Sequence, residues 1–343
     1  MEKRVSLEEY ALARSKRTSF WKRYGAAAFF LFPYLFFFLL FTIYPLIYGI
    51  VMSLMKFNVA DATQNEWRGF QNYYNILFNP NNTYFKNFWW SMRNTVLFSL
   101  ILVPLGVILP LIFAVLINFQ PKGYKFFRAI IYLPSILPVT ASGVIFSALF
   151  SKNFGYINQW TNQTIDWLGS TNTAWFVIIL LCLWGGWGGN FIILSAGLKN
   201  VDKSLLEAAS MDGCDTFKKI VSITIPAIKP QLILCIFTTI IGYFGLYGQI
   251  YVLTGGGPSL MIDGANKMTT QTIMVYLQNL ITGTNYNVFG MVSAMGLTLG
   301  IFIGIVTAFQ LLVTKERPSN SKHRYEYQEY INHKKEVKQE EKA

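Results

Sequence analysis

NTVLFSLILVPLGVILPLIFAVLIN, residues 94–118, is an apolar run without a single Asp, Glu, Lys or Arg. Its apolar residues follow one another directly and do not alternate with polar ones. A run of about 20 apolar residues is what an α-helix needs to cross about 30 Å of hydrocarbon. A membrane β-strand would instead alternate over about ten residues. The run therefore predicts a membrane-spanning helix.

Further stretches of the chain share this character, so we predict an all-α polytopic membrane protein with six transmembrane helices. Prolines occur within several of these stretches. We expect kinked helices whose interrupted hydrogen-bond ladders are repaired by neighbouring helices. The spans make up one permease-like domain, 26–313, between an amino-terminal segment, 1–25, and a charged tail, 314–343. The predicted spans are 26–52, 94–118, 129–150, 174–197, 231–254 and 288–313.

The composition excludes several classes of protein. Hydrophobic residues make up 53% of the chain and charged residues 13%, against about 25% charged in ordinary soluble domains. This argues against a cytosolic enzyme, a disordered chain and a secreted disulfide scaffold. A membrane-embedded enzyme would need clustered Ser, His and Asp or metal ligands at membrane depth. The three cysteines lack metal-binding spacing, and both histidines lie in the tail. We therefore predict no catalytic site, no metal site and no enzyme activity.

The positions of the basic residues predict the orientation in the membrane. The net charge is +12, but no basic stripe of the kind that binds nucleic acid is present, so we expect no nucleic-acid partner. Most of the 29 Lys and Arg residues lie in 1–25, 119–128, 198–230 and 314–343. Cytoplasmic loops carry the excess of Lys and Arg. Both termini are therefore predicted to be cytoplasmic, in a multi-pass protein of the cell membrane.

The predicted cytoplasmic loop KNVDKSLLEAASMDGCDTFKKIVSITIPAIKP, residues 199–230, contains signals for a short, bounded helix. Ser204 followed by Glu207 has the spacing of a capping box. Gly213 can adopt the left-handed conformation that ends a helix. Apolar and small side chains lie between these signals, and they suit a socket in a partner protein. These side chains are Leu205, Leu206, Ala208, Ala209 and Met211.

The spacing within this loop resembles the EAA loop of permease subunits in binding-protein-dependent ABC importers. Glu207-Ala208-Ala209 is followed by Gly213 and then by Ile223-Thr224-Ile225-Pro226, where Ile225 replaces the family's Leu. The resemblance implies the fold of a type I importer permease, in which this helix docks into a cleft of the ATPase. The implied coupling residues are Ser204, Leu205, Leu206, Glu207, Ala208, Ala209, Met211, Asp212, Gly213 and Pro226.

Other motifs are similar to those of the carbohydrate branch of this family, the maltose and glycerol-phosphate type. They are Gly69-Phe70-Gln71-Asn72-Tyr73, Arg93-Asn94-Thr95, Phe127-Arg128 through Leu133-Pro134, Phe154-Gly155-Tyr156-Ile157-Asn158 and Thr254-Gly255-Gly256-Gly257-Pro258. The resemblance implies a sugar as substrate. It also implies a second homologous permease, two cytoplasmic ABC ATPase subunits and an extracytoplasmic solute-binding protein. ATP would be used by those partners, with no cofactor in this chain.

Aromatic and amide side chains in the predicted fourth and fifth spans are candidates for the solute pathway. Aromatic rings stack on the apolar faces of sugars, and amides and phenols bind hydroxyl groups. Packing between helices is an alternative role for the same residues, and the sequence leaves both open. The candidates are Trp184, Trp187, Asn190, Tyr243, Tyr247 and Gln249.

The predicted spans contain no Asp, Glu, Lys or Arg. Ion-coupled carriers commonly place such residues within the membrane. An uncharged pathway suits a neutral solute and an energy source outside the chain. An ion-coupled secondary transporter is the alternative. It would keep transporting without an ATPase and would stop when an uncoupler is added.

Overall fold

The computed structural model of the protein describes residues 24, 25, 27–262 and 265–314, and these residues are mostly helical. The predicted terminal segments 1–25 and 314–343 lie outside the described residues except at their inner ends. Backbone contacts divide the chain into two compact units. One unit is Met1–Phe88 with Leu277–Thr298, and the other is Trp89–Tyr276 with Leu299–Ala343.

Long apolar helices confirm the predicted class of fold. In the described chain, four helices are long and apolar enough to cross a membrane, and two bent helix pairs pass the same test together. The total reaches six if each bent pair is one span, so the predicted number of spans stays a prediction. The four helices are Ala27–Ser53, Thr83–Asn118, Thr171–Lys199 and Tyr286–Thr314.

In the first unit, Asn72 links the short helix α3 by hydrogen bonds to the end of the span Ala27–Ser53. Its side-chain amide donates to the carbonyl oxygens of Ser53 and Met55, both at 2.8 Å. The hydroxyl of Tyr73 lies 2.8 Å from that of Ser53. These bonds give the Gly69–Tyr73 motif a structural role. The elements are η1 (Leu39–Ile43), α2 (Tyr44–Ser53), β1 (Met55–Lys56), η2 (Ala62–Gln64), β2 (Glu66–Trp67, antiparallel to β1) and α3 (Gln71–Leu77).

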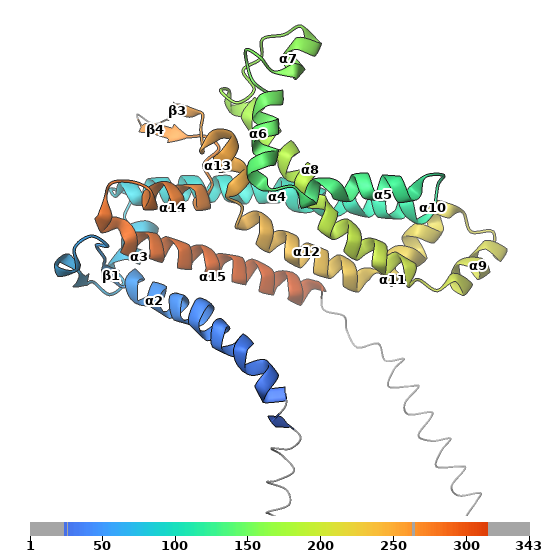
Figure 1. Cartoon of the computed structure of the whole chain (residues 1–343), viewed down its shortest axis with the longest axis horizontal. Coiled ribbons are helices and arrows are strands. Elements are labelled where there is room, and N and C mark those ends of the chain that lie inside the picture. Colours follow the sequence, from blue (N-terminus) through green and yellow to red (C-terminus); the bar gives the residue numbers. More distant parts are fainter. Residues whose placement is uncertain (1–23, 26, 263–264, 315–343) are drawn as a thin grey trace, which may run out of the picture. The chain divides into compact units, whose positions relative to one another are not determined.

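The second unit is built around α8 (Thr171–Lys199), which packs against α5, η3, α6, α12 and α13 (Figure 1). Apolar residues of α8 are fully buried, among them Val177, Ile178 and Leu194. Burial on several sides explains why the α8 sequence is apolar all round. The packed elements are α4 (Thr83–Asn118), α5 (Tyr124–Tyr132), η3 (Leu133–Ile136), α6 (Val139–Leu149), α12 (Lys229–Phe244) and α13 (Gly248–Thr254).

The predicted span 129–150 consists of two helical segments, with the bend at its prolines, and it stays a prediction as one span. The segments Tyr124–Ile136 and Val139–Leu149 meet at an angle of 100°. Pro134 lies in the 3-10 turn η3, and Pro138 is the N-cap of α6. Neither proline has a backbone N–H, so the ladder is interrupted twice within a few residues.

The predicted span 231–254 is also divided. α12 ends at Phe244, and α13 begins at Gly248. Gly245 lies in the break, where a residue without a Cβ weakens the helix. Before α12, the segment Thr216–Ala227 meets Lys229–Phe244 at 71°.

Two prolines follow π-helical turns at the same distance. The π turn η1 ends two residues before Pro45, and the π turn η4 (Ile220–Thr224) ends two residues before Pro226. A proline leaves the carbonyl four residues earlier without its usual donor. A wider turn is one way to accommodate this gap without breaking the helix. The neighbours of η4 are α10 (Thr216–Lys219) and α11 (Ile225–Ala227).

Asn94 and Thr95 attach α4 to a distant loop within the second unit. The amide of Asn94 donates to the carbonyl oxygens of Thr269 (3.1 Å) and Gln271 (3.0 Å). The hydroxyl of Thr95 accepts from the backbone N–H of Ile273 at 2.9 Å. The Arg93–Thr95 motif therefore anchors the segment that follows β4. The remaining elements are β3 (Ser259–Ile262), β4 (Ala265–Met268, antiparallel to β3), α14 (Ile273–Ile281), η5 (Tyr286–Val288) and α15 (Phe289–Thr314).

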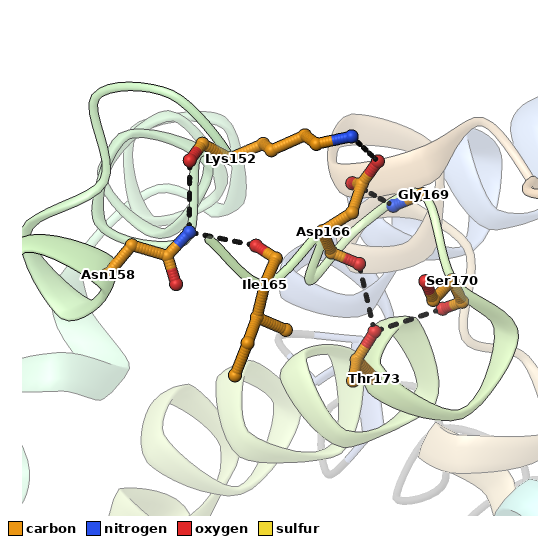
Figure 2. A network of polar contacts seen from close by, with 7 residues as sticks. All are labelled: Lys152, Asn158, Ile165, Asp166, Gly169, Ser170 and Thr173. Carbon is orange, nitrogen blue, oxygen red and sulfur yellow. Dashed lines mark hydrogen bonds and ion pairs between the residues drawn. The ribbon is translucent and has the colours of Figure 1, made fainter. Parts of the chain in front are cut away.

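Asn158 has the same role in the loop between α6 and α8. Figure 2 shows its amide donating to the carbonyl oxygens of Lys152 (3.0 Å) and Ile165 (2.8 Å). The indole N–H of Trp167 donates to the side-chain oxygen of Asn158 at 2.7 Å. Lys152 and Asp166 form an ion pair at 3.3 Å nearby. Asn158 belongs to α7 (Tyr156–Thr161), so these bonds close the loop onto that helix.

Candidate functional site

The predicted coupling helix exists, but its cap is not the predicted one. α9 spans Lys203–Met211, and its N-cap is Asp202, whose carboxylate accepts from the backbone N–H of Ser204 at 2.9 Å. That hydrogen bond holds the pKa of Asp202 below its ordinary value. The predicted capping box of Ser204 and Glu207 is therefore wrong. Asp202 caps the helix two residues earlier, and Ser204 lies inside its first turn.

The carboxyl end of α9 confirms the predicted stop at Gly213. Gly213 has φ +72°, in the left-handed region. Its N–H donates to the Ser210 carbonyl at 3.2 Å, and the Cys214 N–H donates to the Ala209 carbonyl at 2.9 Å. These two bonds form a Schellman motif. The helix is therefore bounded by hydrogen bonds at both ends.

The loop presents apolar side chains away from the rest of the chain. No residue of α9 is buried, and the exposed fractions are 55% for Leu205 and 89% for Met211. Phe217, on α10, is also exposed. The Lys219 ammonium donates to the Ser210 hydroxyl at 3.0 Å, which ties α10 back to α9. The loop is thus an ordered surface with unpartnered apolar groups.

The other predicted coupling residues lie on this same loop. Glu207 is exposed and forms no ion pair or hydrogen bond through its side chain within the described chain. Ala208 and Asp212 are exposed, and Leu206 and Ala209 are half-buried. Pro226 lies apart from them, in the first turn of α11. The structure therefore brings all but Pro226 together on α9 and at its end.

Asn190 repairs a gap that a proline makes in α4. Pro110 has no N–H for the carbonyl of Gly106, four residues earlier. The side-chain amide of Asn190, on α8, donates to that carbonyl at 2.8 Å and to the hydroxyl of Thr239, on α12, also at 2.8 Å. Such repair by a neighbouring helix is how membrane helices tolerate proline. This favours the packing role that the sequence left open for Asn190.

The side chain of Tyr243 lies beside the same residue, Gly106, and also beside Gly186. A Cβ at Gly106 would be 2.9 Å from the Tyr243 ring, and one at Gly186 would be 3.0 Å from its hydroxyl. Tyr243 is 8% exposed. Asn190, Thr239 and Tyr243 therefore form a small polar cluster around Gly106. Sequence reasoning missed Gly106 and Thr239. The signal for Gly106 was its position four residues before a proline, and the sequence held no such signal for Thr239.

The remaining pathway candidates have other neighbours. Trp184 packs on Phe146, with ring centroids 5.5 Å apart, and Trp187 packs edge-on against Phe113 at 5.3 Å. The indole N–H of Trp187 is buried without a hydrogen-bond partner in the described chain. Tyr247 contacts Tyr251, and Gln249 is half-buried. The six candidates therefore do not form one continuous lining.

The structure also contains a cavity of about 390 Å³ that sequence reasoning missed. It lies within the second unit, where residues of α4, the start of α8 and the β3–β4 hairpin meet. The indole N–H of Trp90 donates to the Met268 carbonyl at 2.9 Å, and the Arg93 guanidinium lies 5.3 Å from the Trp90 ring. The lining residues are Trp90, Arg93, Asn94, Leu97, Phe98, Ile101, Thr171, Asn172, Trp175, Ile179, Leu260, Ile262 and Thr269.

Long apolar helices and an ordered loop with exposed apolar side chains define the chain as a multi-pass membrane protein. Residues 106–317, more than half of the chain, match the family described as binding-protein-dependent transport system inner membrane component. The chain belongs to this family. The family is one of transporters rather than enzymes.

Curated relatives and solved structures agree with the family. The arabinooligosaccharides transport system permease protein AraP of Halalkalibacterium halodurans is 28% identical, over 82% of this chain and 85% of that protein. The trehalose/maltose transport system permease protein MalF of Thermococcus litoralis is 32% identical, over 64% and 74%. The lactose transport system permease protein LacF of Rhizobium radiobacter is 27% identical, over 81% and 90%. The predicted resemblance to carbohydrate ABC importer permeases is confirmed.

A solved structure shares the fold. A chain in the crystal structure of a bacterial ABC transporter involved in the import of the acidic polysaccharide alginate has a TM-score of 0.72 and 20% identity. The match covers 87% of this chain and 98% of that chain. The bent helix pairs are therefore compatible with an importer permease fold.

Proposed function

We propose that this chain is a permease subunit of an ATP-driven importer and that it carries a sugar across the cell membrane. The ordered α9, with caps at both ends and exposed Leu205 and Met211, is the observation that carries this proposal. A rigid helix that offers unpartnered apolar groups can respond to a partner whose shape changes. If the two conformations of an ATPase bind α9 differently, the nucleotide state of that ATPase shifts the equilibrium between the conformations of the permease.

The nature of the solute follows from the relatives and from the spans. The three relatives described above are named for the transport of arabinooligosaccharides, of trehalose and maltose, and of lactose. All of these are neutral sugars. The predicted spans contain no Asp, Glu, Lys or Arg, which suits a neutral solute. A mono- or oligosaccharide is therefore the proposed substrate.

The proposed assembly has a second homologous permease, two cytoplasmic ATPase subunits and an extracytoplasmic solute-binding protein. A solved relative in fold is a bacterial alginate ABC transporter in complex with an alginate pentasaccharide-bound periplasmic protein. In this arrangement both termini and α9 face the cytoplasm, as the basic residues predict. ATP binds to the ATPase subunits, and this chain holds no cofactor.

Uptake into proteoliposomes that contain the whole assembly tests this function. Radiolabelled maltose, lactose and an arabino-oligosaccharide serve as probes. We expect at least one probe to enter when ATP and the binding protein are present, and entry to continue when an uncoupler is added. Entry that needs no ATP and stops with the uncoupler would establish the ion-coupled alternative instead.

The role of Tyr243 in the pathway can be separated from its packing. Tyr243→Phe keeps the ring in place and removes the hydroxyl. If that hydroxyl binds the solute, we expect about a tenfold loss of uptake efficiency, the effect of one lost hydrogen bond at a polar site, with unchanged assembly and thermal stability. Trp187→Ala is the companion variant. Wild-type uptake kinetics in both variants would show that these residues have a packing role.

A further inference from the structure

A second, smaller cavity lies at the opposite end of α4 and α8 from the 390 Å³ cavity, on the predicted cytoplasmic side. Its volume is about 140 Å³. Water occupies about 30 Å³ per molecule, and drug-sized ligands need about 300 Å³ or more. The cavity therefore suits a small polar group and is too small for an oligosaccharide. Its lining residues are Ala114, Ile117, Asn118, Gln120, Tyr124, Arg128, Ser195 and Lys199.

The lining follows from helical periodicity. Tyr124 and Arg128 lie four residues apart on α5, and Ser195 and Lys199 lie four apart on α8. Residues at this spacing share one face of a helix. α5 and α8 are packed against each other. Each helix therefore brings one cation and one hydroxyl to the same small space.

The charge of the cavity is positive. Arg128 and Lys199 line it, and its lining contains no carboxylate. Neither side chain forms an ion pair within the part of the chain that the structure describes. Lys199 lies in the last turn of α8, where a cation is favourable. Arg128 is the fifth of the nine residues of α5 and lies outside its last turn, so the helix dipole does not explain its position.

Ser195 provides an independent observation. It is 6% exposed, and its hydroxyl has no hydrogen-bond partner in the described chain. Several helical hydroxyls donate to the carbonyl four residues earlier, as Ser210 does to Leu206 (2.7 Å) and Thr298 does to Ala294 (2.8 Å). A buried polar group without a partner is unfavourable. Ser195 thus lines the cavity with a hydroxyl whose hydrogen-bonding capacity is unused within the described chain.

We propose that this cavity binds a phosphate group, held by Arg128 and Lys199 and by the hydroxyl of Ser195. A tetrahedral oxyanion accepts charge-assisted hydrogen bonds from both cations and takes the unused donor of Ser195. The group belongs either to free inorganic phosphate or to the headgroup of an anionic phospholipid. Bound there, it bridges α5 and α8 close to the point where α8 leads into the coupling loop. None of its lining residues is one of the candidates for the solute pathway.

Thermal unfolding of the full-length chain in its purified assembly tests the site in two arms. The first arm titrates inorganic phosphate in detergent at constant ionic strength. The second arm uses a buffer without inorganic phosphate. It compares nanodiscs of phosphatidylcholine with and without the anionic lipid phosphatidylglycerol. We expect a saturable rise of the unfolding midpoint in at least one arm. A rise in the first arm identifies the free anion, and a rise confined to the second identifies the headgroup.

The variants show whether the effect arises in the cavity. Arg128→Gln should weaken the response about tenfold, and Ser195→Ala should weaken it several-fold with the fold intact. Lys125→Gln is the matched control, because Lys125 is an exposed cation of α5 outside the cavity lining. Its response should equal that of the wild type. The absence of a saturable rise in both arms, or an equal response in Arg128→Gln and the wild type, would overturn the proposal.

Discussion

Replacing Gly213 with valine should reduce ATP-driven uptake at least tenfold while the chain still inserts into the membrane. Gly213 has φ +72°, and a left-handed backbone costs a residue with a Cβ about 1–2 kcal/mol, with β-branched residues the worst tolerated. No atom lies within 4 Å of the position of a Cβ at Gly213. The effect therefore comes from the backbone, because valine would break the Schellman bonds that orient α9 relative to α10.

The measurement pairs uptake with co-purification of the ATPase subunits. Gly213→Asn is the matched control, because asparagine adopts the left-handed conformation far more readily than valine. We expect Asn to retain most activity and Val to lose both uptake and the bound ATPase. Wild-type uptake and ATPase binding in the Val variant would contradict the coupling role of this loop. That outcome would not bear on the proposed phosphate site, because the phosphate site is tested separately by thermal unfolding.

Replacing Asn158 with alanine should lower the thermal stability of the protein more than any exposed substitution in the same loop. Asn158 is 5% exposed, and its side chain forms hydrogen bonds with Lys152, Ile165 and Trp167. Each bond contributes about 1 kcal/mol, and partners left unpaired add to the loss. We therefore expect a destabilisation of about 3 kcal/mol and a fall of the melting temperature by about 5 °C or more.

Asn153→Ala is the control for this variant. Asn153 is exposed in the same loop and has no side-chain hydrogen bond in the described chain. Its replacement should change the melting temperature by less than about 1 °C, as surface substitutions usually do. Equal melting temperatures for the two variants would show that the network around Asn158 does not hold the loop.

The sequence motifs and the structure agree in a specific way. Asn72, Asn94 and Asn158 each belong to a motif that resembled the carbohydrate branch, and each donates its amide to two backbone carbonyls. The partners of Asn94 lie 175 and 177 residues away in the sequence. A pattern in neighbouring residues cannot predict hydrogen-bond partners that are so distant in the sequence. The motifs could be recognised from the sequence, but their structural role could not.

The errors of sequence reasoning have local causes. Asp202 and Ser204 are both good N-cap residues, and a spacing rule cannot decide between caps two residues apart. The spans 129–150 and 231–254 are apolar throughout, so hydropathy gives no sign of a break. Prolines interrupt the hydrogen-bond ladder at the first break, and the second break falls at Gly245.

The amino-acid sequence by itself determined the membrane class, the apolar helices, the short exposed helix α9 and the family, because these depend on composition and spacing along the chain. The tertiary structure alone decided the role of Asn190 and the existence of the cavity around Ser195. Asn190 lies 84 residues from the carbonyl that Pro110 leaves without a donor, and they meet only when α8 packs against α4. Hydrogen bonds between helices depend on how the helices are placed in space, and the spacing of residues along one helix does not specify that placement.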